Sequence, residues 1–453
     1  VYSMAIEMVS RADAALMNLF GLQEIADTIY KFGSEAQREQ YLPRFCSGEA
    51  SGAMALTEPD AGSDLQAVRL KAVQTEDGQW RLEGVKRFIT NGCADISLVM
   101  ARSEAGSSSG RGLSLFIYER DDRMTIRRIE DKLGIHGSPT CEIQFNQAPA
   151  ELLGQRKMGL IKYTMSLMNG ARLGVAAQAV GIAEAAYRAA AKYAGERVQF
   201  KKPIREFSAV SELLTEMKVE IEACRSLLYE TSRIVDLKEG LEEQQEKHPE
   251  QKKALKADVK QYTRYASLLT PIIKARASES ANSISYKALQ VHGGVGYTKD
   301  FDVERYVRDA RITNIYEGTT QLQVVAAIGG VMTGAAGELL DEYEKEHDFE
   351  AVIDLADKAR ALRNCLEQGV ELVKAEHDHV FQEFHAARLV EMATDALMGF
   401  LLCRDSLQSE RKRTVAQVFL QGATLRTQAN LACIQSRDRT LLEGHKAILN
   451  HVQ

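Results

Sequence analysis

Hydrophobic and polar positions follow two different periods along this chain, and the changes between them divide it into segments. Up to about residue 47, apolar residues recur at helical spacing, as in ADTIYKFGSEAQREQYLPRF. Ser34 is a candidate N-cap of a helix in this segment, and Pro43 and Gly48 are expected to mark the end of the helical region. The pattern predicts a helical N-terminal domain over residues 1–47.

A strand-like alternation replaces the helical period after this point. Short runs such as ISLVMARS, LSLFIYERD and MTIRRIE alternate apolar with polar residues, and Gly, Asp and Asn turns separate them. Asp77-Gly78 predicts a hairpin turn, and residues 105–112 read as a Gly/Ser-rich loop. We expect residues 48–154 to form a compact all-β domain.

Helical periodicity returns at about Met158 and continues. Met168–Tyr193 is rich in Gly and Ala, which let helices approach closely, Ser208–Leu237 is amphipathic, and Ser267–Gln290 is a further helix with a proline near its start. The charge-dense segment 240–260 is expected to be a solvated helical hairpin tip or loop, with a partner surface as the alternative. Residues 155–330 are therefore predicted to form a helical domain.

A tail of helical pattern follows residue 330. GVMTGAAG looks like a linker, and Asp348–Val373, Phe381–Cys403 and Thr414–Ile448 are the expected helical regions. This tail, residues 331–453, is either a bundle of its own or docks on the preceding one. The predicted fold class is α+β, multidomain and mainly α, with domains at 1–47, 48–154, 155–330 and 331–453. The N-terminal domain is expected to be incomplete, because the chain begins without Met and in the middle of a helical pattern.

Composition narrows the function classes. The net charge of −6 argues against a general nucleic-acid binder, since phosphate binding requires clustered Lys and Arg. No apolar run approaches the roughly 18–20 residues of a membrane span. The seven cysteines are scattered without a C-x-x-C pair, which fits reduced thiols in a cytoplasmic protein, and we expect no metal site.

The stretch RDARITNIYEGTTQLQ places a single carboxylate, Glu317, directly before Gly318. A carboxylate beside an aromatic residue, a glycine and a helix start suits a general base, because apolar walls raise the pKa of a carboxylate and free helix N–H groups favour a developing negative charge. Thr320-x-x-Gln323 has the spacing of a capping box. The alternative is an ordinary turn with a solvated Glu.

Four other stretches carry candidate chemistry. TEPDAGSD offers backbone and hydroxyl donors for a cofactor, or is an Asx-rich turn. KRFITNG reads first as a strand end. ERVQFKKP brings Arg197 close to Phe200, which would suit a phosphate and an aromatic ring, or would be a basic helix cap. QVHGGVGY is a glycine turn without the strand–G-x-G-x-x-G–helix context of a Rossmann site.

Together these stretches resemble the acyl-CoA dehydrogenase family over roughly residues 1–330. The motifs that carry the resemblance are TEPDAGSD, KRFITNG, KLGIHGSPT, MNGARLGVAAQAVGIAEAAYRAAAKYAGERVQF, QVHGGVGY and RDARITNIYEGTTQLQ. The helical tail, the MNGAR form and the long charged hairpin look more like the longer bacterial members, which include dehydrogenases of methylthiopropionyl-CoA type substrates.

The resemblance implies a helical N-domain, a central β-barrel, a four-helix bundle and an extra C-terminal helical domain, with FAD bound between two subunits of a dimer or tetramer. The implied FAD contacts are Met54, Leu56, Thr57, Gly62, Ser63, Phe88, Ile89, Thr90, Arg197, Phe200, Gln290, Gly293, Gly294, Thr319 and Gln321. The implied substrate contacts are Ser63, Asn169, Tyr316 and Gly318.

The resemblance also implies the reaction, an α,β-dehydrogenation of an acyl-CoA thioester to the trans-2-enoyl-CoA. Glu317 stands at the family's catalytic-base position, with its backbone N–H and a ribityl hydroxyl of FAD bonding the thioester oxygen. Some members place the base one residue before the arginine that matches Arg172; that position is Ala171 here, which cannot accept a proton. Arg172 supports the charge near the base, or forms a helix–helix salt bridge. An electron-transfer flavoprotein would receive the electrons.

The sequence departs from the family pattern at several positions. Phe88 stands where many members have Trp, Asn169 replaces an Asp, Lys201 replaces a usual Gly and His136 replaces a common Arg. Two other functions stay open at this point. One is an oxidase that passes electrons to oxygen. The other is a nucleic-acid-associated member of the fold, which would need a basic tail, whereas this tail is rich in acidic residues.

Overall fold

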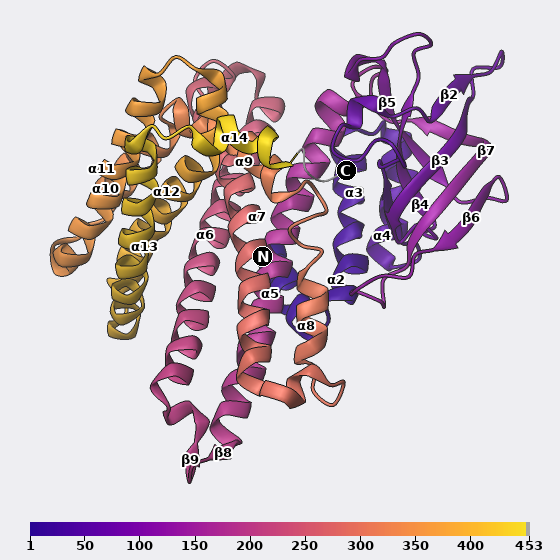
Figure 1. Ribbon diagram of the computed structural model, residues 1–453. Helices are drawn as coiled ribbons and strands as arrows, with labels where there is room; N and C mark the ends of the chain where they lie inside the picture. Colours follow the sequence, from indigo (N-terminus) through magenta and orange to yellow (C-terminus); the bar gives the residue numbers. More distant parts are fainter. Residues whose placement is uncertain (450–453) are drawn as a thin grey trace. The chain divides into compact units, whose positions relative to one another are not determined.

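The computed structural model describes residues 1–449 and divides into two compact units (Figure 1). Unit 1 contains Val1–Ala185 and Val295–Glu317, and unit 2 contains Ala186–Gly294 and the chain from Gly318 onward. Each unit is described by itself. Residues 450–453 of the predicted tail lie outside the described residues.

Helices form the N-terminal part of unit 1, as predicted. They are α1 (Tyr2–Ala12), α2 (Ala14–Gly21), α3 (Ile25–Phe32) and α4 (Glu35–Ser47). Ser34 caps α4 in a complete capping box with Gln37, which confirms the N-cap prediction, and Gly48 ends the helix in the left-handed region at φ 76°. Pro43 was wrongly expected to end it. The proline costs α4 one backbone hydrogen bond, but burial of Phe45 keeps the last turn in place.

The strands of unit 1 close into a barrel, which confirms the central β-barrel of the predicted fold class. Strand β4 pairs with β2, β2 with β3, β3 with β7, β7 with β5, and β5 again with β4, while β1 adds to β4 and β6 to β7. The strands are β1 (Gly52–Ala55), β2 (Lys71–Gln74), β3 (Trp80–Thr90), β4 (Ile96–Arg102), β5 (Leu113–Glu119), β6 (Met124–Ile129) and β7 (Thr140–Leu152).

The two faces of the barrel wall build two separate cores. Side chains such as Leu82, Phe116 and Phe145 fill the barrel interior. Side chains that point outward, such as Leu98 and Leu115, pack against apolar residues of α3 and α4. Because both faces of β4 are buried, its sequence is an almost continuous apolar run rather than an alternation.

Glycine in helix α5 (Met165–Glu196) allows a close helix contact within unit 1. A Cβ atom at Gly181 would lie 2.5 Å from the backbone oxygen of Glu7 in α1. The small residues of this helix therefore serve the close packing expected from the sequence. A π-helical turn, Gly159–Thr164, precedes α5, and α8 (Val303–Ala310) completes the unit.

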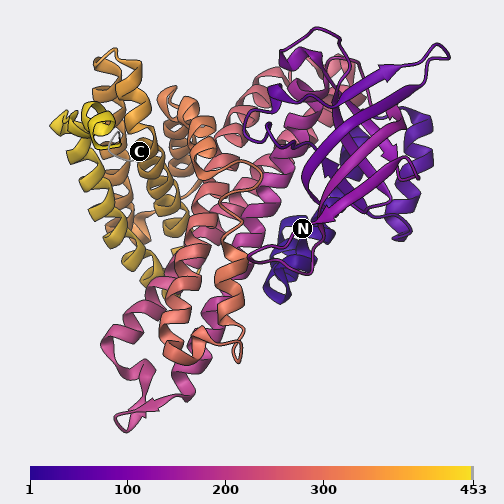
Figure 2. The same ribbon diagram turned by 45° about the vertical axis from the view of Figure 1, so that its right-hand side comes forward.

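Unit 2 is helical apart from a hairpin of two short strands. Its elements are β8 (Val198–Gln199), β9 (Lys202–Pro203), α6 (Ser208–Lys247), α7 (Lys256–His292), α9 (Thr320–Met332), α10 (Ala335–Glu346), α11 (Ile353–Ala375), α12 (His379–Ser406), α13 (Glu410–Ser436) and α14 (Thr440–Leu449). Figure 2 shows the C-terminal helices running beside one another.

Two boundaries in unit 2 differ from the prediction. The charged segment 240–260 is a helical hairpin tip, one of the two forms expected, in which α6 ends at Lys247 and α7 begins at Lys256. Because α7 begins earlier than predicted, Pro271 lies well inside it rather than near its start. The supposed linker at 330–337 consists of the ends of α9 and α10, which meet at Thr333 and Gly334. Gly334 has φ 86°, a conformation that glycine adopts at little cost.

The C-terminal helices dock on α6 and α7 through buried ion pairs, which resolves the two alternatives for the tail. The carboxylate of Glu220 in α6 accepts two hydrogen bonds from the guanidinium group of Arg276 in α7, at 2.6 and 2.9 Å. Asp395 of α12 lies 3.7 Å from the same guanidinium and accepts two hydrogen bonds from Arg426 of α13. Despite its burial, the pKa of Glu220 falls to about 2, because Arg276 and Ser280 stabilise the carboxylate.

A second group of charges extends this contact along α6. Glu222 pairs with Arg411 at 2.8 Å and with Lys412 at 2.8 Å, both from α13. Glu230 pairs with Arg404 of α12 at 2.9 Å. Carboxylates spaced along α6 are thus matched by basic residues of the C-terminal helices.

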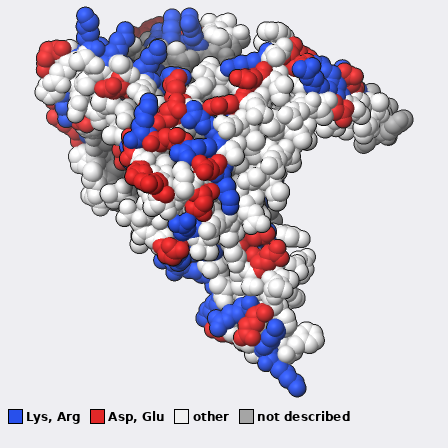
Figure 3. Space-filling view, turned by 90° about the vertical axis from the view of Figure 1, so that its left-hand side faces the viewer, with Lys and Arg blue, Asp and Glu red and all other residues white. Residues whose placement is uncertain are grey.

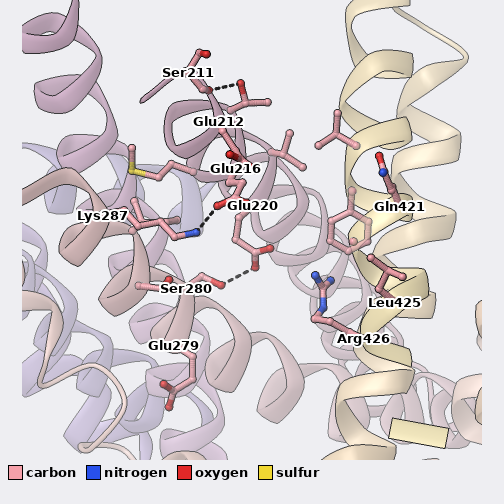
Figure 4. A pocket seen from close by; sticks show the side chains of 18 of the residues that line it. Ser211, Glu212, Glu216, Glu220, Glu279, Ser280, Lys287, Gln421, Leu425 and Arg426 are labelled. Atoms are coloured by element: carbon pink, nitrogen blue, oxygen red, sulfur yellow. Dashed lines mark hydrogen bonds and ion pairs between the residues drawn. The ribbon is translucent and has the colours of Figure 1, made fainter. Parts of the chain in front are cut away.

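A cavity of about 880 Å³ opens between α6, α7 and α13 (Figure 4). Several of its charged side chains are paired with one another or with a neighbour, among them Glu220 with Arg276, and Lys287 with Glu216 at 2.7 Å. Because these charges are already paired, they are poor partners for a charged ligand. We therefore attribute the cavity to the way the helices pack and assign it no ligand.

Three observations on residues 1–449 bear on other function classes. No single described helix is long and apolar enough to cross a membrane. The helices α9 and α10 taken together have the length and apolar composition of a membrane span, but the chain bends by 67° between them. Within that range no group of His, Cys, Asp or Glu side chains could hold a metal ion. On the face in Figure 3, basic and acidic side chains are interspersed, which does not suit a phosphate backbone.

We expect His385 to make the C-terminal helices sensitive to acid. The side chain is 1% exposed in α12, and neither ring nitrogen has a hydrogen-bond partner among the described residues. Burial, assisted by Arg388, lowers the pKa of His385 from 6.5 to about 4. The unfolded chain then binds the extra proton below pH 6.5, so stability falls as the pH drops through this window.

The expected loss attributable to His385 is about 2 kcal/mol between pH 7.5 and pH 5, from the linkage of that pKa difference. Urea unfolding at both pH values measures it. His385→Leu should show a loss smaller by this amount than the wild type, and His379→Leu, an exposed position on the same helix, should keep the full loss. Equal losses in wild type and His385→Leu would contradict the assignment.

Candidate active site

Glu317 lies in an irregular turn segment between α8 and α9, in a strained backbone conformation. Its φ is 54° and that of Gly318 is 92°, so two successive residues occupy the left-handed region. Glycine adopts this region freely, but for Glu it costs on the order of 1–3 kcal/mol. Such strain persists only where neighbouring contacts hold it, and it is concentrated at functional sites.

Arg172 holds the backbone of Glu317 from α5. Its Nε donates to the Glu317 carbonyl oxygen at 3.4 Å, and its Nη1 donates to Asn169 Oδ1 at 3.2 Å. Burial lowers the pKa of Arg172, and the negative charge of Glu317 opposes that effect. Arg172 therefore contacts the main chain of Glu317, the predicted base, and Asn169 orients the arginine.

Tyr316 anchors the turn on its other side. Its hydroxyl donates to Gln178 Oε1 of α5 and lies 3.4 Å from Asn18 Oδ1 of α2. Gln178 in turn donates to the Ala14 carbonyl at 2.9 Å. Burial raises the pKa of Tyr316, so the phenol stays protonated as a donor. These hydrogen bonds occupy the hydroxyl of Tyr316, which the sequence predicts as a substrate contact. Only the ring of Tyr316 could therefore face a ligand.

The start of the same segment is attached to the barrel. Asp309 accepts a hydrogen bond from the backbone N–H of Ile135, and Arg308 donates to the Leu133 carbonyl at 3.1 Å. A Cβ at Gly134 would lie 2.5 Å from the backbone of Arg308. The loop KLGIHGSPT, for which the sequence suggested no role, thus holds the start of the segment that leads to Glu317.

The two motifs expected to face FAD in unit 1 are joined by a buried lysine. Lys86 is 0% exposed, and its Nζ donates to the Leu56 carbonyl at 2.7 Å and to Glu58 Oε1 at 2.9 Å. The Glu58 carboxylate also accepts from the backbone N–H groups of Arg69 and Leu70. Burial lowers the pKa of Lys86 to about 8. Sequence reasoning missed this lysine, because its partners lie 28 and 30 residues away.

Phe88 is turned outward by a break in the strand. The β3–β7 register shifts between Lys86 and Ile89, and Phe88 has φ 59° and is 54% exposed, with the Arg87 guanidinium 4.8 Å from its ring centre. Ile89 points into the barrel core at 2% exposure, so only its main chain could face a cofactor. A β-bulge that re-aims a side chain is common beside active sites.

The other predicted FAD contacts of unit 1 divide by exposure. Leu56 is buried in the core, Met54, Thr57 and Thr90 are half-buried, and Gly62 and Ser63 are exposed. Neutral hydroxyls, loop N–H groups and one exposed aromatic ring are suitable partners for a flavin ring, which is flat and carries polar edges. The residues present therefore fit the FAD that the resemblance implies.

The predicted FAD contacts of unit 2 lie on its surface, apart from the half-buried Thr319. Phe200 is 90% exposed at the tip of the β8–β9 hairpin, where Phe200 and Lys201 have φ 48° and 68°. Arg197, Gln290, Gly293, Gly294 and Gln321 are also exposed. Gly293 ends α7 with φ 65° and ψ −143°, a conformation that only glycine adopts readily. An arginine and a bare aromatic ring suit a phosphate and an adenine.

The helix start after Glu317 differs by one residue from the prediction. Thr319, not Thr320, is the N-cap of α9, since its hydroxyl accepts from the Leu322 N–H at 3.4 Å. Gln323 does not complete a capping box; its amide donates to the Gly318 carbonyl at 2.9 Å. The left-handed Gly318 turns the chain one residue earlier, which shifts the cap.

Four segments of the chain match models of one protein family. Family models match as "Acyl-CoA dehydrogenase, N-terminal domain" at residues 1–49, "middle domain" at 53–148, "C-terminal domain" at 161–329 and "Acyl-CoA dehydrogenase C terminal" at 332–439. The last of these covers residues 332–439 of the extra helical tail.

Relatives of known name agree with these matches. A short-chain specific acyl-CoA dehydrogenase from Megasphaera elsdenii is 37% identical, with 73% of this chain and 81% of the relative covered. A 3-methylmercaptopropionyl-CoA dehydrogenase from Ruegeria pomeroyi is 35% identical, with 72% of this chain and 57% of the relative covered.

Solved structures show the same fold. A chain of the structure described as "Electron transferring flavoprotein of Acidaminococcus fermentans: Towards a mechanism of flavin-based electron bifurcation" is 37% identical, with 72% and 80% of the two chains covered and a TM-score of 0.63. An acyl-CoA dehydrogenase complexed with FAD from Bacillus anthracis is 25% identical, with 90% and 72% covered and a TM-score of 0.77. The chain belongs to the acyl-CoA dehydrogenase family.

Proposed function

We propose that this protein binds FAD and oxidises a short-chain or sulfur-containing acyl-CoA thioester to its trans-2-enoyl-CoA, with Glu317 as the base. The observation that carries the proposal is the strained backbone of Glu317, which Arg172 holds at its carbonyl oxygen. The names of the Megasphaera and Ruegeria relatives support the two substrate types.

In the proposed reaction, the Glu317 carboxylate accepts a proton from the α-carbon of the thioester. The Glu317 backbone N–H would donate to the thioester oxygen, so that the charge developing there is stabilised as the proton leaves. FAD, when bound, supplies the acceptor for the hydride that leaves the β-carbon. Glu317 ends protonated, the substrate loses two hydrogens, and a double bond forms between the two carbons.

Arg172 contributes by position and charge. Its guanidinium holds the Glu317 carbonyl oxygen and with it the main chain of the turn, and its positive charge lies close enough to Glu317 for the two charges to attract each other. Ala171 offers no acidic group, so no second base competes from this position of α5.

For FAD we propose contacts from both units in two subunits. Thr57, Ser63, Phe88 and Thr90 would surround the flavin ring of one subunit, and Arg197, Phe200 and Gln290 of another subunit would reach the pyrophosphate and adenine ends. The 90% exposure of Phe200 supports this arrangement, because a second subunit and its cofactor would cover that ring. A homodimer or a tetramer would satisfy it.

We further propose that an electron-transfer flavoprotein reoxidises the enzyme in the cytoplasm. The likeness to a chain in the Acidaminococcus structure supports a flavoprotein acceptor. Oxygen consumption measured with and without such an acceptor separates this role from an oxidase. A screen of anaerobic flavin bleaching over short, long, branched and sulfur-containing acyl-CoAs then identifies the acyl chain.

Glu317→Gln should keep its bound FAD and lose substrate-dependent flavin reduction. Removing a general base costs about 10²–10⁴-fold in rate. Anaerobic stopped-flow with butyryl-CoA measures the rate, and Glu119→Gln, which removes a carboxylate from a surface ion pair with Arg44, should react as fast as the wild type. Reduction of Glu317→Gln at a near wild-type rate would exclude Glu317 as the base.

Arg197→Ala should weaken FAD retention, because a charge-assisted contact to the pyrophosphate is lost. We expect the ratio of flavin to protein to fall by at least about half after gel filtration at low protein concentration, whereas the nearby exposed Arg205→Ala keeps it. Light scattering on the same samples reports the oligomeric state. Unchanged flavin content in an intact dimer of Arg197→Ala would count against the cross-subunit contact.

A further inference from the structure

The carbonyl group directly after the proposed base binds a buried ammonium group. Lys274 lies in the middle of α7 and is 0% exposed, and its Nζ donates to the Gly318 carbonyl oxygen at 2.6 Å. Gln323 of α9, also 0% exposed, donates to the same oxygen at 2.9 Å. One backbone oxygen thus accepts from a cation and from an amide, each from a different helix of unit 2.

Burying an ammonium group in this position is expensive. Removing an ammonium group from water is strongly unfavourable even after relaxation, so the contacts that Lys274 makes in the interior, among them the one to the Gly318 carbonyl, must be strong. Charge-assisted hydrogen bonds are roughly twice as strong as neutral ones. The lysine therefore holds the Gly318 carbonyl more firmly than Gln323 alone would.

The adjacent carbonyl is held in the same way within unit 1. Arg172 donates to the oxygen of Glu317, and Lys274 to the oxygen of Gly318, so two consecutive carbonyls each bind a cation on a separate helix. Fixing both oxygens fixes the orientation of two consecutive peptide planes. The two planes meet at the Gly318 Cα atom and set its φ of 92°, and the first plane also fixes the carbonyl end of Glu317, the residue that carries the carboxylate.

We propose that Lys274 is a positioning residue for the reaction, with Gln323 as its neutral second donor. The proposal rests on the proposed function, in which Glu317 is the base. Lys274 acts through the backbone, so its loss should affect the proton-transfer step more than the binding of substrate, since misplacement of a reacting group by about 1 Å can cost 10²-fold in rate.

The test uses the FAD-loaded enzyme and three variants. Lys274→Met keeps the length of the side chain without the charge, Gln323→Leu removes the neutral donor, and Lys287→Met is the control, since Lys287 lies on the same helix in a surface pair with Glu216. Hydrogen–deuterium exchange of peptides covering residues 308–323 reports the hold on the segment without any substrate. Stopped-flow with butyryl-CoA and its α-deuterated form separates substrate affinity from the reduction rate.

We expect the amide hydrogens of residues 313–320 to exchange at least about tenfold faster in Lys274→Met than in the wild type. Gln323→Leu should give an intermediate exchange rate, and Lys287→Met should exchange at the wild-type rate. The reduction rate of Lys274→Met should fall roughly 10- to 100-fold with substrate affinity changed less than about threefold and a larger α-deuterium isotope effect. A general loss of stability would instead raise exchange throughout α7 and leave the isotope effect at the wild-type value, which would overturn the proposal.

The outcomes separate this inference from the proposed function. If the wild type bleaches with no acyl-CoA, the proposed function fails, and faster exchange confined to 313–320 in Lys274→Met still supports the hold on Gly318. If exchange of that segment equals the wild type in both Lys274→Met and Gln323→Leu, the positioning role is wrong whatever the kinetics. Should Lys274→Met fail to fold, Gln323→Leu and Lys274→Arg carry the same two measurements.

Discussion

Holding Glu317 and Gly318 in the left-handed region is the constraint on which the candidate active site depends. An acidic residue does not adopt this conformation without support. The support comes from the carbonyl contact to Arg172, from the hydroxyl of Tyr316 on Gln178, and from the cap of α9 at Thr319. The polypeptide is thereby attached on both sides of the base, and these attachments place the carboxylate through its backbone.

Buried basic side chains also bind oxygen atoms of neighbouring segments elsewhere in the molecule. Lys86 joins strand β3 to the loop after β1 through the Leu56 carbonyl and Glu58, as Lys274 joins α7 to the Gly318 carbonyl. The extra C-terminal helices use the buried pairs around Arg276, two residues further along α7. Buried ion pairs add little net stability but specify one arrangement, which suits a helix that must present several side chains at fixed positions.

The sequence predicted most helices and strands but not the long-range contacts that hold the candidate active site. Periodicity located the helical, β and helical regions, and Ser34 capped its helix as predicted. Pro43 and the supposed linker were misjudged, because packing of neighbouring helices overrides local helix-breaking signals. Family motifs singled out Glu317 and Arg172, whereas Lys274 had no local signature, since the carbonyl it binds lies 44 residues away.

The central claim, that Glu317 removes the α-proton of an acyl-CoA, can be tested without any redox step. A 3-thia-acyl-CoA has sulfur in place of the β-carbon and so has no β-hydrogen to lose. Mass spectrometry of this compound after incubation with FAD-loaded enzyme in D₂O reports removal and return of the α-proton. We expect wild type to exchange the α-hydrogens for deuterium and Glu317→Gln to leave them in place. Equal deuterium uptake with both proteins would contradict the account.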